Sequence, residues 1–218
     1  MVKFYFSEEQ ELDDIAWIYS EYDFFVKNKY KVYYPKISKE LTEKMIEKPS
    51  SAQNKKILEK EFTEIFDHEK NIYDKTIIEI SQNWRKIEKK FVNILNQLNY
   101  DYPKNVSCFV SRYGPGGSYY PDSKISTRVI LENKTDVKEA NETIAHEIVH
   151  LVINGLSEKY KLGFENTERL VDLILTKTPI SKLLDNPRFQ NFGDKRLDII
   201  FDEHSTNLET LLKKFKAN

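Results

Sequence analysis

Cysteine and glycine are scarce in this chain. The 218 residues include one cysteine, Cys108, so an intramolecular disulfide cannot form. A chain without disulfides is typical of a reducing compartment. The start, "MVKFYFSEEQELDD", turns acidic before an apolar signal core develops, so we expect no secretion signal and a cytoplasmic location. All six glycines follow Tyr113, which indicates that the two halves are built differently.

Long hydrophobic runs and an excess of one charge are also missing. No apolar run approaches the roughly 20 residues that span a bilayer, so we expect no membrane span. With 34 basic and 35 acidic residues, the chain has no global field that would attract nucleic acid. The tyrosines of "KNKYKVYYPK" are more typical of residues that cover a helical core. We therefore expect no nucleic-acid partner.

The first part of the chain, residues 1–104, has a helical pattern throughout, with breaks at Pro35 and Pro49. Ser7 and Gln10 have the spacing of a capping box, which predicts that the first helix begins there. A longer helical tract starts at about residue 51. Asn71 is a candidate point at which this tract divides into two helices.

From residue 106 the pattern changes. The stretches "VSCFVSR" and "STRVILE" predict two short strands on either side of a loop rich in turn residues. Helices are expected at about 137–154, 166–176 and 205–216. The predicted fold is α+β: a helical N-terminal region, residues 1–104, packs on a domain of residues 105–218 that contains a short β-sheet.

The stretch "ETIAHEIVHLVI" places two of the four histidines in an apolar helix that Gly155 is expected to end. Residues four apart share a helix face, so His146 and His150 project within reach of one metal ion. Glu147 lies about 100° round the helix, beside the ion without being a ligand. This HExxH spacing predicts a zinc site with Glu147 as general base. Histidines satisfied by ordinary core hydrogen bonds are the alternative interpretation.

A catalytic zinc usually has three protein ligands and keeps a fourth position for water. Downstream, "FENTERLVDLIL" predicts a helix that begins near Asn166 and carries Glu168 and Asp172 on one face. If Glu168 is the third ligand, Asp172 lies one turn away and can accept the outer N–H of a zinc-bound histidine. Glu165 and His204 remain alternative third ligands.

HEIVH, followed by a short connection and a glutamate with an aspartate four residues later, resembles the gluzincin metallopeptidases, the thermolysin-like group that includes the small minigluzincins. The resemblance covers roughly residues 106–175 and implies a zincin-like domain. It assigns zinc to His146, His150 and Glu168, general acid–base chemistry to Glu147, and support of the ligands to Asp172. The strand 127–132 would be the family's edge strand, which pairs with an extended peptide.

The expected function is zinc-dependent hydrolysis of peptide bonds in a peptide or protein substrate. Zinc would lower the pKa of its bound water to about 7, and Glu147 would take the proton and later deliver it to the leaving amine. Members of the family use a downstream tyrosine or histidine as donor to the oxyanion, and Tyr160 and His204 are the candidates here. The alternative function is a non-catalytic, zinc-containing module that binds peptides or regulates a partner. The N-terminal half is a candidate for covering the cleft or selecting substrates.

Overall fold

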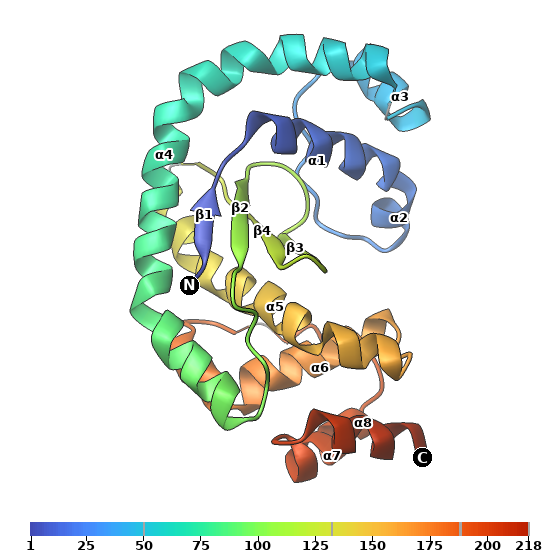
Figure 1. The fold of residues 1–218 in the computed structure, drawn as a ribbon. Coiled ribbons are helices and arrows are strands. Elements are labelled where there is room, and N and C mark those ends of the chain that lie inside the picture. Colours follow the sequence, from blue (N-terminus) through green and yellow to red (C-terminus); the bar gives the residue numbers. More distant parts are fainter. Residues whose placement is uncertain (50, 132, 188, 218) are drawn as a thin grey trace.

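The structure is a computed structural model that describes residues 1–49, 51–131, 133–187 and 189–217. Helices surround a small mixed β-sheet, which confirms the predicted α+β class (Figure 1). No helix within the described ranges is long and apolar enough to cross a membrane. Glu132, which ends the second predicted strand, and Asn218, which ends the second predicted domain, lie outside the described residues.

The sheet has the strand order β1-β2-β4-β3. The strands are β1 (Lys3–Tyr5), β2 (Ser107–Ser111), β3 (Gly117–Tyr120) and β4 (Lys124–Arg128). β1, β2 and β4 are parallel, and β3 runs antiparallel to β4 at one edge. Two strands were predicted and are found as β2 and β4. The expectation that the second would be the edge strand is wrong, because β3 pairs with β4 on its outer side.

The N-terminal region is not helical throughout, because β1 pairs in parallel with β2. Three residues are too few for an alternating pattern to stand out in the sequence. The first helix, α1 (Glu8–Ser20), begins where predicted, and the Ser7 hydroxyl accepts the backbone N–H of Gln10 at 3.3 Å. Two short helices follow, α2 (Tyr22–Lys27) and α3 (Lys39–Glu47).

The long helix α4 (Ala52–Gln97) arches along one side of the molecule (Figure 1). The predicted division at Asn71 is wrong, because the helix passes through this residue without a break. Asn71 is exposed, and an exposed asparagine lowers helix stability only slightly. Phe66 and Tyr73, seven residues apart on either side of it, are both buried and hold one helix face against the protein.

Buried side chains form two clusters, and α4 contributes to both. The first cluster joins the sheet to the C-terminal part of α4 and to the helices that follow the sheet. The second joins α1, α2 and α3 to the N-terminal part of α4 through side chains such as Leu58 and Phe62. The division into residues 1–104 and 105–218 stays a prediction.

The helices after the sheet are α5 (Lys134–Lys159), α6 (Phe164–Lys177), the short 3₁₀ helix η1 (Pro179–Leu183), α7 (Arg196–His204) and α8 (Leu208–Ala217). The three predicted helices correspond to α5, α6 and α8, whereas α7 was not predicted. The expectation that Gly155 ends α5 is wrong, because the helix continues to Lys159. A glycine inside a helix costs only about 1 kcal/mol, and Leu156 beyond it still packs on the first cluster.

Candidate metal centre

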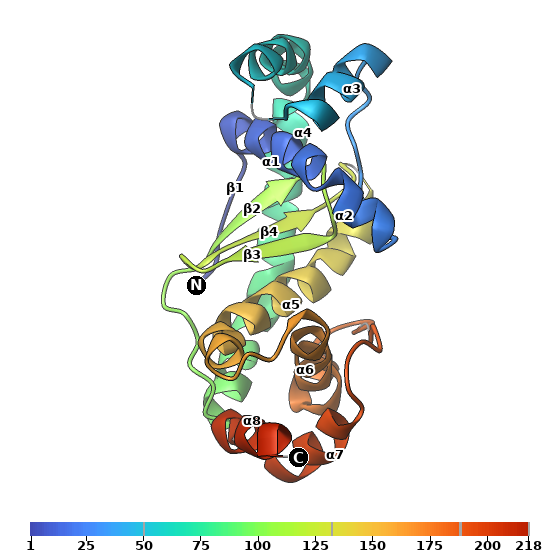
Figure 2. The same ribbon diagram turned by 90° about the vertical axis from the view of Figure 1, so that its right-hand side faces the viewer.

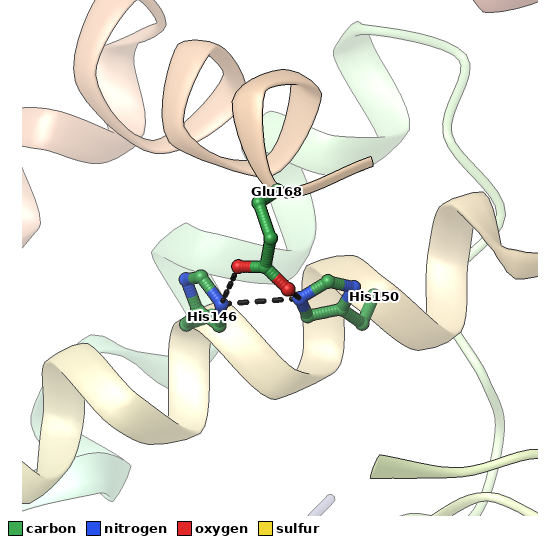
Figure 3. A group of neighbouring side chains, drawn as sticks. All are labelled: His146, His150 and Glu168. Atoms are coloured by element: carbon green, nitrogen blue, oxygen red, sulfur yellow. Dashed lines mark hydrogen bonds and ion pairs between the residues drawn. The ribbon is translucent and has the colours of Figure 1, made fainter. Parts of the chain in front are cut away.

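The packing of α6 against α5 brings three predicted ligands together (Figure 3). His146 and His150 project from one face of α5, and Glu168 reaches them from α6. Its Oε2 lies 3.2 Å from His146 Nε2, and its Oε1 lies 3.2 Å from His150 Nε2. The alternative third ligands are elsewhere: Glu165 is exposed on α6, and His204 ends α7.

The donor atoms have the spacing that a single zinc ion requires. Ligand atoms at 2.0–2.2 Å from a tetrahedral zinc lie about 3.3 Å from one another. The two Nε2 atoms are 3.1 Å apart, and each lies 3.2 Å from a carboxylate oxygen of Glu168. When both rings are neutral, one Nε2 can donate a proton to the other, but the two lone pairs cannot both point at each other without a proton between them. A cation between the two nitrogens would accept both lone pairs. The residues present therefore fit a zinc ion.

Charge at the centre favours a cation. Burial lowers the pKa of His146, but the carboxylates of Glu168 and Glu147 outweigh this effect and the pKa is raised overall. Burial raises the pKa of Glu168, but hydrogen bonds from His146 and His150 outweigh it, so the pKa falls well below its usual range. Glu168 is therefore ionised, and its negative charge stabilises positive charge beside it, as a proton on His146 or as a metal ion.

Glu147 follows the first histidine on α5 and is only 6% exposed. Burial, together with the charge of Glu168, raises the pKa of this carboxyl, although the nearby histidines lower it. A carboxyl group that holds its proton more tightly than usual is suited to general acid–base work near neutral pH. Glu147 thus lines the same cavity as the two histidines and Glu168, and its role as general base stays a prediction.

A glycine on β3 allows the sheet to approach Glu147. A Cβ atom added to Gly117 would lie 2.5 Å from Thr143 Cγ2, 2.7 Å from Glu147 Oε1 and 3.0 Å from the backbone oxygen of Ser126. These distances are too short for real contacts, so only glycine fits between β3 and α5 here. The sequence marks this glycine as a turn residue and gives no sign of its closeness to Glu147.

Asp172 lies one turn beyond Glu168 on α6 and is 1% exposed. Its Oδ2 accepts the backbone N–H of Gln190 at 2.6 Å, while Oδ1 has no hydrogen-bond partner among the described residues. His150 Nδ1 is likewise buried without a partner in the described ranges. The predicted hydrogen bond from a histidine to Asp172 is therefore not formed. Gln190, which the sequence did not single out, instead donates its side-chain N–H to Glu168 Oε2 at 3.0 Å.

The two predicted oxyanion donors do not reach the metal centre. Tyr160 follows the end of α5, and its hydroxyl donates to Glu209 on α8 at 3.3 Å. His204 Nε2 lies 3.5 Å from a carboxylate oxygen of Glu203. Neither residue lines the cavity, so both expectations are wrong. Figure 2 shows α7 and α8 below α5 and α6, on the side away from the sheet.

The histidines, Glu147 and Glu168 line a cavity of about 700 Å³. This volume is within the range typical of small-molecule and cofactor sites. β3 forms part of its lining, and Tyr119 stacks on His150 with ring centroids 4.7 Å apart. α1 and α2 form another part, contributing mainly aromatic side chains. Residues from both halves of the chain therefore enclose one space in front of the metal centre.

Comparisons of this chain with protein families, with curated proteins and with solved structures found no match.

Proposed function

We propose that this chain is a zinc-dependent metallopeptidase of the gluzincin type, with a zincin-like arrangement of β2–β4, α5 and α6. The observation that carries the proposal is the convergence of His146, His150 and Glu168 on one point, with Glu147 beside them in the same cavity. Two imidazoles and a carboxylate make up the ligand set of several zinc peptidases. The residues that match the resemblance in the sequence are also the ones that meet in space.

Zinc bound by these three side chains would supply Lewis-acid activation of a water molecule and of the peptide carbonyl. The Glu147 carboxylate would accept a proton from the attacking water and then donate it to the nitrogen of the leaving amine. Gln190 would hold Glu168 in place through its hydrogen bond. Asp172 would fix the segment that carries Gln190 by accepting its backbone N–H.

The substrate backbone would bind along β3. This strand is at the edge of the sheet, and all four of its residues line the cavity. An extended peptide can add to such an edge through main-chain hydrogen bonds, which recognise a peptide regardless of its sequence. The role expected of strand 127–132 therefore passes to residues 117–120.

Tyr30 is our candidate for the donor to the developing oxyanion. Its ring lines the cavity, and burial together with the charge of Glu168 raises the pKa of its hydroxyl. Among the described residues this hydroxyl has no hydrogen-bond partner, whereas that of Tyr119 donates to Asn154 at 3.4 Å. A free hydroxyl donor near the metal ligands can stabilise charge that develops during attack.

The alternative function, a structural zinc site in a non-catalytic module, has less support. A structural zinc usually has four protein ligands, and the group formed by the described residues has three. His204, which could have completed such a set, lies outside the cavity. An open coordination position is the arrangement that hydrolysis requires.

The decisive experiment measures zinc in the purified protein, in His146→Ala and in His68→Ala. His68 is exposed on α4 and serves as a matched control for loss of a histidine. We expect about one zinc per chain in the wild-type protein and in His68→Ala, and none in His146→Ala. Absence of zinc from all three after supplementation would refute the proposal.

A second measurement separates catalysis from metal binding. Glu147→Gln should keep its zinc and lose turnover of an unstructured protein substrate, because the amide cannot accept the proton. Glu165→Gln, an exposed change on α6, should alter neither property. Unchanged turnover in Glu147→Gln would remove the assigned general base.

A further inference from the structure

Three exposed aromatic side chains, well separated in the sequence, line the same cavity. Trp17 is 39% exposed on α1, Phe24 is 46% exposed on α2, and Phe164 is 53% exposed at the start of α6. Aromatic side chains are usually buried, and contiguous exposed apolar surface indicates a binding site. The three rings come from both halves of the chain, so the tertiary fold brings them together.

Two further rings connect them into one surface. Trp17 contacts Phe25 with ring centroids 5.6 Å apart, and Phe25 contacts Tyr30 at 6.0 Å. Phe24 stacks on Tyr30 at 5.7 Å, and Tyr30 contacts Phe164 at 6.4 Å. We call these five residues the aromatic wall. It extends from α1 to α6, and all of its members line the cavity.

The aromatic wall ends beside a metal ligand. Phe164 and Glu168 are four residues apart on α6 and therefore share a helix face. The wall, β3 and the metal centre thus line one continuous space. A peptide that lies along β3 with its scissile bond at the metal would therefore occupy the space that these rings line.

We propose that the aromatic wall is the specificity site of this protein, and that it takes an aromatic or large aliphatic side chain of the peptide bound at the metal centre. This inference rests on the proposed peptidase function for its occupant. Burial of such a side chain against rings is favourable because it removes apolar surface from water on both partners. Away from the metal centre, Glu21 and Lys31 line the cavity with opposite charges, and Glu142 accepts two backbone N–H groups.

Tryptophan fluorescence can report binding at the aromatic wall. Of the two tryptophans, Trp17 belongs to the wall, whereas Trp84 is fully buried in the first hydrophobic cluster. A ligand that covers the wall should change the fluorescence of Trp17 and leave that of Trp84 unchanged. Peptide binding can therefore be followed without any turnover.

The test uses zinc-supplemented, full-length Glu147→Gln and a set of blocked alanine hexapeptides. One peptide contains only alanine, and in the others a single phenylalanine or a single arginine occupies each position in turn. We expect one phenylalanine position to strengthen binding by about tenfold over the all-alanine peptide. Equal binding of all peptides, or preference for an arginine peptide, would overturn the inference.

Substitutions in the aromatic wall test whether its side chains cause the preference for phenylalanine peptides. Phe24→Ala and Phe164→Ala should each remove most of the preference for phenylalanine. Val26→Ala, on α2 and 58% exposed but outside the cavity, should retain it. Loss of the preference in Val26→Ala alone would place the specificity site elsewhere.

Cleavage by the wild-type protein separates this inference from the proposed function. Selective binding of phenylalanine peptides without cleavage of any peptide would support the wall and refute the peptidase. Cleavage of all the peptides at equal rates, with equal binding, would support the peptidase and refute the wall.

Discussion

The two sides of the cavity differ in what their side chains require from the rest of the protein. α5 and α6 contribute buried ionisable groups whose charges are compensated within the site. α1 and α2 contribute neutral rings, of which Trp17 and Phe24 remain exposed. Burial of charge is tolerated only where a partner meets it, whereas an exposed ring can be removed without leaving an unpaired group. Substitutions on the first side should therefore have the larger effects.

Two buried glutamates, one on α6 and one on α1, have pKa values shifted in opposite directions. Glu168 on α6 has its pKa lowered by the two histidines, so it stays charged. Glu11 on α1 is also fully buried, but burial raises its pKa to about 8, and hydrogen bonds such as that from the Arg112 backbone N–H lower it only in part. Glu168, the proposed metal ligand, is ionised, while Glu11 is neutral at moderately acidic pH. The same residue type is thus a charged group in one region and packs as a neutral group in the other.

The largest effect is expected from Glu168→Ala. The variant removes one of three ligands and leaves two histidines that face each other without a carboxylate, so zinc and turnover should both be lost. Glu165→Ala, on the exposed side of the same helix, is the matched control and should retain both. Elemental analysis and a peptide-cleavage assay check the result. If Glu165→Ala loses zinc instead, the third ligand has been assigned to the wrong residue.

Tyr30→Phe should have the next largest effect. The ring of the aromatic wall is kept and only the hydroxyl is removed, so kcat should fall by about 10²-fold while KM changes little. Tyr160→Phe is the control, because the Tyr160 hydroxyl donates to Glu209 and does not line the cavity. Steady-state kinetics on one peptide compare the two. A fall in kcat for Tyr160→Phe alone would return the oxyanion role to the tyrosine expected from the sequence.

Gly117→Ala tests how closely β3 must approach α5. The added Cβ would overlap Thr143 and Glu147, so either the strand or the general base must move. We expect the free energy of unfolding to fall by about 1–3 kcal/mol, with a loss of turnover and retention of zinc. Gly116→Ala adds the same atom one residue earlier, where nothing lies within 4 Å, and should behave as wild type. Chemical denaturation and kinetics on both variants measure the difference.

The sequence predicted the polar side of the cavity and missed the aromatic side for a physical reason. His146 and His150 are four residues apart on one helix, which local periodicity was sufficient to select. Glu168 and Asp172 repeat that spacing, but only the resemblance to a family chose Glu168 over Glu165 and His204. Trp17 and Phe164 become neighbours of the metal centre only through tertiary packing, which no local pattern encodes. The errors at Asn71 and Gly155 have a related cause, because burial on either side of a weak helix former outweighs its small local cost.

The smallest effect on turnover is expected from Glu11 on α1, where a substitution changes stability instead. Because the folded state raises the pKa of Glu11 from 4.5 to about 8, the folded protein binds this proton more tightly than the unfolded chain does. The stability contributed by the neutral carboxyl is therefore present below about pH 4.5 and is lost as pH rises towards 8. Glu11→Gln, which cannot ionise, should lose less stability than wild type between those pH values, by up to about 5 kcal/mol. Urea denaturation of both proteins across this range measures the difference; parallel pH profiles would show that Glu11 is charged in the folded state, and the contrast with Glu168 would disappear.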